Sequence, residues 1–337
     1  MVFVKPFYYI DKGKLYTMLM DGRETGKTTG TIKGCIERFL QSDGQYVTAW
    51  VRRWKSDTQD AKRGFFAKIL ENDWFPDHKF SVKNNIGYID ETPAFYFLTL
   101  SVNARTRGGG IPHLKLMVFD EFLIDPRISR YIGKDEPAIF DSLFDTYARP
   151  RTTSTDNRAQ ALFLANTFTT INPYFLYHNI KFNKNQKVFQ NKFIYAEKLH
   201  TIVNREPSEW ELFTSGKSYG DHANDAKFIL DDNSMIRKLP AKTQPLFIFL
   251  FNGKTWGAWR DTRNGEIYIS EKHDKNIKPC FYLSREDRTP AMLNIRAFKR
   301  GYFYNLVAFC QSMGCLWYTS LEAQYVWDEI SQYLNIA

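Results

Sequence analysis

Short apolar runs alternate with helical stretches over the first 200 residues of the chain. The apolar runs lie at 15–20, 46–51, 95–100, 116–119 and 161–165, and the helical stretches at 28–40, 61–70 and 137–147. Apolar runs of this length are typical of strands that are buried on both faces of a parallel sheet. Their alternation with helices therefore predicts an α/β unit.

The pattern changes after about residue 200. Residues 204–245 are mostly polar and predict a connector with room for a short helix. Beyond it, strands predicted at 246–251, 256–260 and 266–270 are joined by Asn-Gly pairs, the strongest short signal for a hairpin. Helices are predicted at 291–313 and 320–334. The predicted organisation is an α/β domain over 1–203, a linker over 204–245 and a small α+β domain over 246–337.

Composition excludes several classes of protein. The 337 residues are 43% hydrophobic, which is too much for a disordered chain, and no apolar run is long enough to cross a bilayer. The first residues lack the pattern of a signal peptide, so we expect a cytoplasmic protein without a membrane partner. Four cysteines without a C-x-x-C pair argue against a disulfide framework or a structural zinc site. The net charge of +9 favours a polyanionic partner without deciding for nucleic acid.

Residues 21–28 (Asp-Gly-Arg-Glu-Thr-Gly-Lys-Thr) follow a predicted strand and open a predicted helix, which is the setting of a Walker A phosphate loop. The backbone N–H groups that face the phosphates in such a loop belong here to Gly22, Arg23, Glu24, Thr25 and Gly26. Lys27, which we expect to be exposed, reaches the β- and γ-phosphates, and the Thr28 hydroxyl is a ligand of Mg²⁺. Asp21 stands where the motif usually has its first glycine. The alternative is therefore a glycine-containing turn with a solvated lysine.

A second motif, at 116–121, is an apolar strand that ends in Asp120 and Glu121, as a Walker B strand does. Asp120 is predicted to hold Mg²⁺, and Glu121 to act as general base on the attacking water. The alternative is an ordinary buried strand that meets solvent with charged residues. Because the two motifs lie about ninety residues apart in one α/β unit, they predict binding and hydrolysis of ATP with Mg²⁺.

Segments outside these motifs resemble the phi29-type phage genome-packaging ATPases, the small ring motors that move double-stranded DNA into a prohead. The shared segments are Val-Arg-Arg-Trp-Lys at 51–55, Phe-Pro-Asp-His at 75–78, Val-Phe-Asp-Glu-Phe at 118–122 and Asn-Pro-Tyr-Phe at 172–175. The second and fourth are not general features of P-loop proteins, so the resemblance is specific. That family also has an arginine at the position of Arg23, but a glycine at that of Asp21.

The resemblance implies both a fold and a set of partners. The fold is an additional-strand P-loop ATPase of the FtsK/HerA lineage, followed by a linker and an RNase H-like domain. We expect no nuclease activity, because the first strand of that domain has no acidic residue and only Asp261 follows the second. The implied partners are double-stranded DNA, the portal or connector of the prohead and further copies of the chain in a homopentameric ring. Use of a packaging RNA stays open, and the implied location is the host cytoplasm with transient attachment to the prohead.

The resemblance also assigns three residues around the nucleotide. Arg149 aligns with an arginine finger that acts on the neighbouring subunit, and Arg107 with a lysine that also reaches a neighbour's nucleotide. Asn166 stands in the sensor position, where it contacts the attacking water or the γ-phosphate. The residues by themselves leave alternatives, since an arginine is favoured at a helix C-terminus and an asparagine caps turns.

A motor of this kind contacts DNA phosphates without reading the sequence, so its contacts should be lysine and arginine. The candidates are Arg52, Arg53, Lys55, Lys62, Arg63, Arg105, Arg107, the stretch 181–193, and the helical face of Arg296, Lys299 and Arg300. An ordinary solvated surface is the alternative for each group.

The sequence thus predicts an ATP-driven translocase of double-stranded DNA. Two other functions stay open: a P-loop ATPase of the helicase or partition type, and a nucleic-acid-binding scaffold with an inert loop. Duplex unwinding would favour the first, and the aspartate at position 21 keeps the second open.

Overall fold

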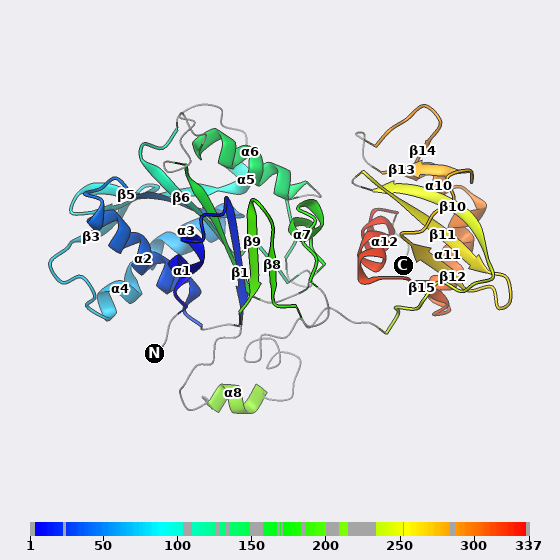
Figure 1. Ribbon diagram of the computed structural model, residues 1–337, viewed down its shortest axis with the longest axis horizontal. Helices are drawn as coiled ribbons and strands as arrows, with labels where there is room; N and C mark the ends of the chain where they lie inside the picture. Colours follow the sequence, from blue (N-terminus) through cyan, green and yellow to red (C-terminus); the bar gives the residue numbers. More distant parts are fainter. Residues whose placement is uncertain are drawn as a thin grey trace. The chain divides into compact units, whose positions relative to one another are not determined.

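The computed structural model forms two compact units, residues 1–230 and 231–337 (Figure 1). The residues it describes are 4–22, 25–103, 110–125, 129–132, 135–148, 158–166, 169, 171–182, 186–199, 209–214, 234–251, 253–283 and 287–334. None of the helices in these ranges is both long and apolar enough to cross a membrane.

A nine-stranded sheet runs through the N-terminal unit in the order β3-β4-β5-β2-β6-β7-β1-β9-β8. Its central strands from β5 to β9 are parallel, while β3 and β4 at one end of the sheet and β8 at the other pair antiparallel. The strands are β1 (Tyr16–Asp21), β2 (Val47–Arg52), β3 (Phe80–Lys83), β4 (Ile86–Ile89), β5 (Thr92–Thr99), β6 (Leu114–Asp120), β7 (Gln160–Asn166), β8 (Val188–Gln190) and β9 (Ile194–Lys198). The helices are α1 (Pro6–Ile10), α2 (Lys27–Gln41), α3 (Lys55–Arg63), α4 (Ala67–Glu71), α5 (Leu100–Asn103), α6 (Glu136–Ala148), α7 (Pro173–Tyr177) and α8 (Glu209–Thr214).

Strand β7 lies between β1, which leads into the phosphate loop, and β6, which ends at Asp120 and is followed by Glu121. This inserted strand defines the additional-strand class of P-loop ATPases, so the predicted fold is confirmed. Parallel pairing places the carboxyl ends of the three strands at one edge of the sheet, where Asp21 pairs with Asn166 and Asp120 with Leu164.

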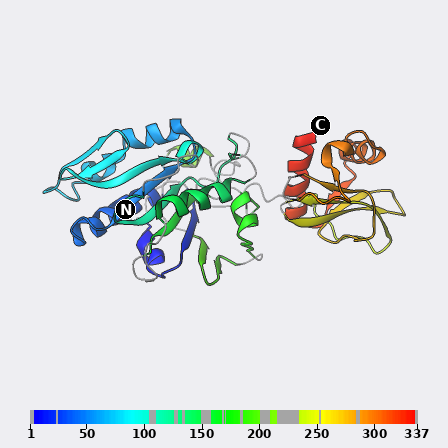
Figure 2. The same cartoon turned by 90° about the horizontal axis from the view of Figure 1, so that it is seen from above.

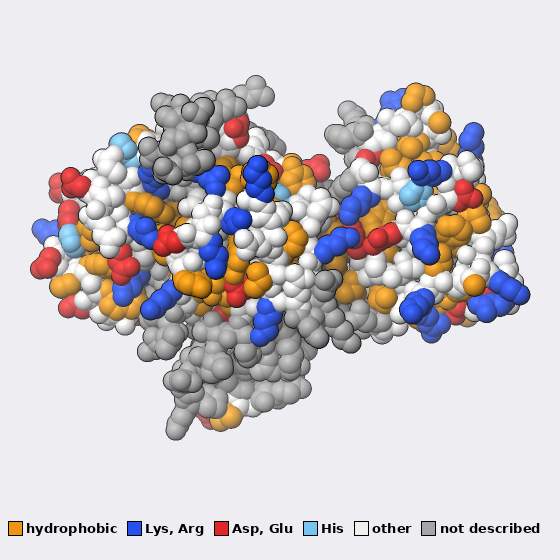
Figure 3. Space-filling model, viewed as in Figure 1, with side chains coloured by type: hydrophobic (Ala, Val, Ile, Leu, Met, Phe, Trp, Pro, Cys, Tyr) orange, Lys and Arg blue, Asp and Glu red, His pale blue; other side chains and the backbone are white. Residues whose placement is uncertain are grey.

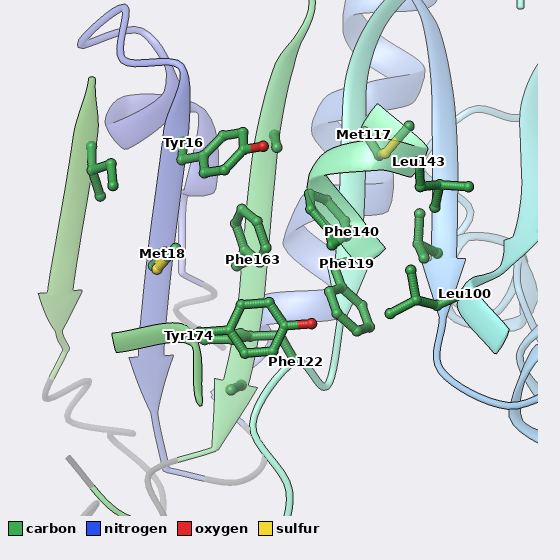
Figure 4. Close-up of a cluster of buried hydrophobic side chains, with 14 of the residues drawn as sticks. Tyr16, Met18, Leu100, Met117, Phe119, Phe122, Phe140, Leu143, Phe163 and Tyr174 are labelled. Carbon is green, nitrogen blue, oxygen red and sulfur yellow. The ribbon is translucent and has the colours of Figure 1, made fainter. Parts of the chain in front are cut away.

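The two faces of the sheet are each covered by helices, and the alternation of side chains along a strand sorts the core into two layers. Met18 and Met20 face the layer of α6 and α7, whereas Leu19 faces that of α2. Figure 4 shows the first layer, in which Phe119 stacks on Phe140 at 5.3 Å between ring centroids and Tyr174 lies beside Phe122. Seen from above, helices lie on both sides of the strands (Figure 2).

Several elements differ from those predicted in the N-terminal unit. The stretch predicted as one helix at 61–70 is part of two, α3 and α4, separated by a turn at Gly64. The β3–β4 hairpin was not predicted, because its strands are short and half exposed and its turn is built by Asn84 in a left-handed conformation. Strands β8 and β9 were also missed.

The C-terminal unit has a six-stranded sheet in the order β14-β13-β10-β11-β12-β15. Strands β10 to β12 form an antiparallel meander, and β13 and β14 continue from β10 in parallel, as in an RNase H-like sheet. The strands are β10 (Thr243–Phe251), β11 (Lys254–Asp261), β12 (Ile267–Ser270), β13 (Cys280–Tyr282), β14 (Leu293–Asn294) and β15 (Leu316–Tyr318). Its core packs Phe247, Phe249 and Trp256 against Trp327.

The helices of this unit differ from the sequence prediction in one respect. The stretch 291–313 is not a single helix but comprises β14, α10 (Ile295–Phe298) and α11 (Tyr302–Ser312), with Gly301 as the N-cap of α11. Arg296 and Lys299 therefore lie in or at the end of a one-turn helix, and Arg300 lies beyond it, so the predicted helical face of three basic residues does not form. The final helix, α12 (Leu321–Leu334), is close to its predicted bounds.

Candidate nucleotide-binding site

The phosphate loop joins the carboxyl end of β1 to the first turn of α2. Gly26 is the N-cap of α2 and has φ +75°, a conformation that glycine adopts without strain. Its carbonyl accepts the N–H of Gly30 at 2.7 Å and so starts the helix. Arg23 and Glu24 lie outside the described residues.

Asp21, at the position of the missing glycine, is the last residue of β1 and is 1% exposed. Its Oδ1 accepts the backbone N–H of Gly22 at 2.8 Å. The aspartate therefore closes the strand rather than forming part of the turn, and the turn begins at Gly22.

Lys27 is buried, with 8% of its surface exposed, so the expectation of an exposed lysine is wrong. Its Nζ donates to the carbonyl of Gly22 at 2.5 Å, to Thr25 Oγ1 at 3.2 Å and to Asn166 Oδ1 at 3.3 Å. Burial lowers the pKa of the Lys27 ammonium to about 8, against the opposing charges of Asp21 and Asp120. The ammonium thus sits at the centre of the loop, held by oxygens that a phosphate group can replace.

Thr28, in the first turn of α2, lies against the end of β6. Its Oγ1 donates to the two carboxylate oxygens of Asp120, at 3.3 and 3.4 Å. A hydroxyl and a carboxylate are the oxygen ligands that Mg²⁺ takes beside nucleotide phosphates, so this donor set fits the ion. Burial raises the pKa of the Asp120 carboxyl, while the Arg52 guanidinium opposes that rise.

Glu121 follows β6, and 62% of its side chain is exposed. Its backbone has φ +63°, which is uncommon for a residue other than glycine. Arg52 bridges the two acids, with Nη1 at 2.6 Å from Glu121 Oε2 and Nη2 at 3.0 Å from Asp120 Oδ2. Asp120, Glu121 and Arg52 therefore form one charged group beside Thr28.

Two of the predicted DNA contacts are wrong. Arg52 is 16% exposed and is committed to the two acids of the site. Arg53 is 4% exposed and forms an ion pair with Glu136, which is fully buried. Neither guanidinium is available to the phosphates of DNA, because each forms ion pairs with carboxylates that are distant in sequence.

Asn166 ends β7, and its Oδ1 accepts from Lys27 at the same edge of the sheet. The structure thus brings together Gly22, Thr25, Gly26, Lys27, Thr28, Asp120, Glu121 and Asn166. Arg107, Arg149 and Arg105 lie outside the described residues.

Arg52 belongs to this site although it was not predicted to, because the signal for it is the pairing of two strands that are distant in sequence. Strand β2 is the parallel neighbour of β6, with Val51 paired to Phe119, so the residue after Val51 lies next to the acids after Phe119. Consecutive strand residues point to opposite faces. Arg52, the last residue of β2, and Arg53, directly after it, therefore point to opposite sides, Arg52 toward Asp120 and Arg53 toward Glu136 at the start of α6.

Lysine and arginine side chains are scattered over the face of the molecule that Figure 3 shows. Lys55, Lys62, Arg63, Lys187, Lys192, Lys299 and Arg300 are exposed or half-exposed. In the stretch 181–193, Phe182 and Phe189 pack on the core, so only Phe193 is an exposed aromatic among the described residues of that stretch.

Comparison with known proteins connects this site to a family. The family model of the podovirus DNA encapsidation protein (Gp16) matches residues 1–336. The chain belongs to this family. It is similar to the DNA packaging protein of Bacillus phage phi29, with 28% identity over 310 residues, which cover 91% of this chain and 90% of that protein.

Two solved structures are also similar. The bacteriophage phi-29 viral genome packaging motor assembly matches with a TM-score of 0.77 and 24% identity, over 99% of this chain and 100% of that chain. The N-terminal domain of the DNA packaging ATPase from bacteriophage phi29 matches with a TM-score of 0.52 and 27% identity, over 59% of this chain and 97% of that one. The first shows that the fold extends through both units.

Proposed function

We propose that this chain is an ATP-driven translocase of double-stranded DNA that packages a phage genome into its prohead. The observation that carries the proposal is the grouping of Lys27, Thr28, Asp120 and Glu121 at one sheet edge, in a chain of the DNA encapsidation family. The family likeness supplies the substrate and the geometry supplies the chemistry.

Each residue has a distinct role in the proposed reaction. Lys27 donates to phosphate oxygens in place of its loop carbonyls, and Gly22, Arg23, Glu24, Thr25 and Gly26 present backbone N–H groups. Thr28 and Asp120 would hold Mg²⁺, which neutralises phosphate charge when bound. The Glu121 carboxylate accepts a proton from the attacking water, and Asn166 orients that water or the terminal phosphate. Arg52 holds the Glu121 carboxylate beside Asp120 and balances the charge of the two acids.

The proposal extends to the assembly. Arg149 and Arg107 would reach the nucleotide of a neighbouring subunit in a homopentameric ring, so hydrolysis depends on assembly. The C-terminal unit would contact DNA or the portal, and a packaging RNA if one is used, without nuclease activity. The ring would form in the host cytoplasm and attach to the prohead only while DNA is packaged.

Nucleotide affinity is expected to fall above pH 8, because Lys27 must be charged to bind phosphate. Below its pKa of about 8 the free protein already holds the proton. Above it, binding has to take up a proton, so Kd rises about tenfold per pH unit until the pKa of the bound state is reached. Titration of a fluorescent ATP analogue between about pH 7.5 and 9.5 measures this slope.

The matched control is Lys27→Arg, whose guanidinium stays charged throughout this range. Its affinity, whatever its absolute value, is expected to be independent of pH. A flat profile for the wild-type protein, or the same slope in the arginine variant, would remove Lys27 titration from nucleotide binding.

Duplex DNA is expected to stimulate ATP hydrolysis and to bind with little sequence preference and a steep salt dependence. Each phosphate contact contributes about −0.9 to the slope of log K against log[salt]. Fluorescence anisotropy over a salt series, with two unrelated duplexes, measures the sequence preference and the salt dependence of binding. A flat salt response, or a strong preference for one duplex, would contradict phosphate tracking, and duplex unwinding would favour a helicase.

Paired substitutions identify the contacts. Lys55→Gln/Lys62→Gln, Lys187→Gln/Lys192→Gln and Lys299→Gln/Arg300→Gln each remove two exposed or half-exposed charges from a different surface. Substitution of a pair that contacts DNA is expected to make the slope of log K against log[salt] less steep by about 1.8 and to weaken binding to both duplexes equally. The matched control is Lys68→Gln, whose ammonium pairs with Glu71 on α4, and its slope should equal that of the wild type.

A further inference from the structure

A buried polar network lies beneath the carboxyl end of β6, on the face of the sheet covered by α6 and α7. Its centre is the ion pair of Arg53 and Glu136. Arg53 Nε donates to the two carboxylate oxygens at 3.0 and 2.9 Å, and Nη2 lies 2.9 Å from one of them. The pair is almost entirely removed from solvent.

The Glu136 carboxylate is also bound by two neutral donors. The Tyr174 hydroxyl donates to Oε1 at 2.9 Å, and the backbone N–H of Ile132 donates to Oε2 at 2.6 Å. Figure 4 shows Tyr174 in the core beside Phe122, with its hydroxyl directed toward the side of Phe119. The network therefore joins Arg53, the residue directly after β2, to α7 and to the first residue of α6. Both oxygens of the Glu136 carboxylate accept hydrogen bonds.

The remaining donors of Arg53 bind the main chain that carries the proposed general base. Nη1 donates to the carbonyl of Glu121 at 3.0 Å, and Nη2 to the carbonyl of Phe122 at 2.7 Å. Glu121 adopts φ +63°, a conformation that persists only where its surroundings impose it. A fixed carbonyl fixes the peptide plane and therefore the direction in which the Glu121 side chain leaves the backbone.

We propose that Arg53 and Glu136 are positioning residues for ATP hydrolysis, which hold the backbone of Glu121 so that its carboxylate faces the nucleotide. This inference rests on the proposed ATPase function. Stability alone does not account for the pair, because packed apolar residues of similar volume are as stabilising as a buried ion pair or more so. The forked guanidinium is what reaches one carboxylate and two successive carbonyls together, which a lysine ammonium lacks the geometry to do.

Arg53→Lys tests this directly, because it keeps the buried charge pair and removes the fork. We expect kcat to fall at least tenfold, while the KM for ATP and the Kd of a fluorescent ATP analogue change less than twofold. Arg53→Met/Glu136→Gln removes both charges. Its amide oxygen can accept from the Ile132 N–H, and its NH2 group can donate to the Tyr174 hydroxyl. The same loss of kcat is expected with the melting temperature preserved. Wild-type kcat in a folded form of either variant would overturn the proposal.

A double-mutant cycle separates positioning from a structural role. If Arg53 acts through Glu121, Arg53→Lys lowers the single-turnover rate at least tenfold in the wild type but less than twofold in the Glu121→Gln background. Equal losses in both backgrounds would show that the pair acts on the fold and not through Glu121. Ile69→Ala, in the buried face of α4, controls for lost stability and is expected to keep kcat. Absence of ATPase activity in the wild type would instead overturn the proposed function, so the two failures are distinct.

Discussion

Glu121→Gln is expected to bind ATP like the wild type and to hydrolyse it about 10²–10⁴-fold more slowly. The amide keeps the size of the side chain and its place beside Arg52, but it cannot accept a proton from water. Because 62% of the Glu121 side chain is exposed, the substitution creates no cavity, and the melting temperature should stay within a few degrees of the wild-type value. Phosphate release gives the rate of hydrolysis, and binding of a fluorescent ATP analogue to the same preparations gives the affinity.

The control for this variant is Glu71→Gln, an exposed glutamate on α4 that pairs with Lys68. It carries the same chemical change away from the nucleotide and should hydrolyse ATP at the wild-type rate. Undiminished hydrolysis by Glu121→Gln would remove Glu121 from the mechanism. Loss of binding together with hydrolysis would make it part of the nucleotide pocket instead.

The elements that build the site could be predicted because their signals are local. Strands β1, β6 and β7 are buried on both faces, so each appears in the sequence as a continuous apolar run. The phosphate loop and the acids of β6 stand directly at the ends of two of these runs. Sequence alone therefore located the sheet edge at which Lys27, Thr28 and Asp120 come together.

What the sequence did not predict depends on partners distant along the chain. Arg52 and Arg53 form a basic dipeptide, and such a pair is typical of a nucleic-acid contact. Their roles are set instead by Glu121 and Glu136, which only the pairing of β2 with β6 and the start of α6 bring within reach. Burial of Lys27 has in part the same origin, because its ammonium is enclosed by the Gly22 carbonyl of its own loop and by Asn166, which is distant in sequence at the end of β7.

Short elements were missed for a different reason. The strands β3, β4 and β8 are half exposed and only three or four residues long, too short for an alternating pattern to stand out. In the C-terminal unit, the apolar residues over 291–313 recur with the period of a single helix. Gly301 nevertheless interrupts this stretch and is the N-cap of α11. A glycine N-cap has no side chain to accept a hydrogen bond from the first turn of the helix, so the start of α11 lacks the usual Ser, Thr, Asp or Asn signal in the sequence.

Mixed rings are expected to recover ATPase activity that neither of two variants has alone. In the proposed ring, Arg149 stabilises the charge that develops on the transferred phosphoryl group in the neighbouring subunit, an effect worth about 10³–10⁵-fold in rate. Arg149→Ala subunits keep an intact nucleotide site, whereas Lys27→Ala subunits cannot bind the phosphates but still carry the arginine. When the two are mixed, an intact site lies beside an intact arginine at some interfaces, and part of the activity should return. Phosphate release at fixed total protein over a series of mixing ratios measures the recovery.

The matched control for this mixture is the double variant Lys27→Ala/Arg149→Ala in place of Lys27→Ala. It assembles with the same defect in nucleotide binding but brings no arginine to the interface, so its mixtures with Arg149→Ala should stay inactive. Recovery with both partners would mean that assembly alone, and not the arginine, restores hydrolysis. No recovery with either, in rings shown to contain both kinds of subunit, would place Arg149 within its own subunit's site or in the fold. Recovery only with Lys27→Ala would make each catalytic site the joint product of two subunits, which is how a ring of identical chains can make one hydrolysis event depend on its neighbour.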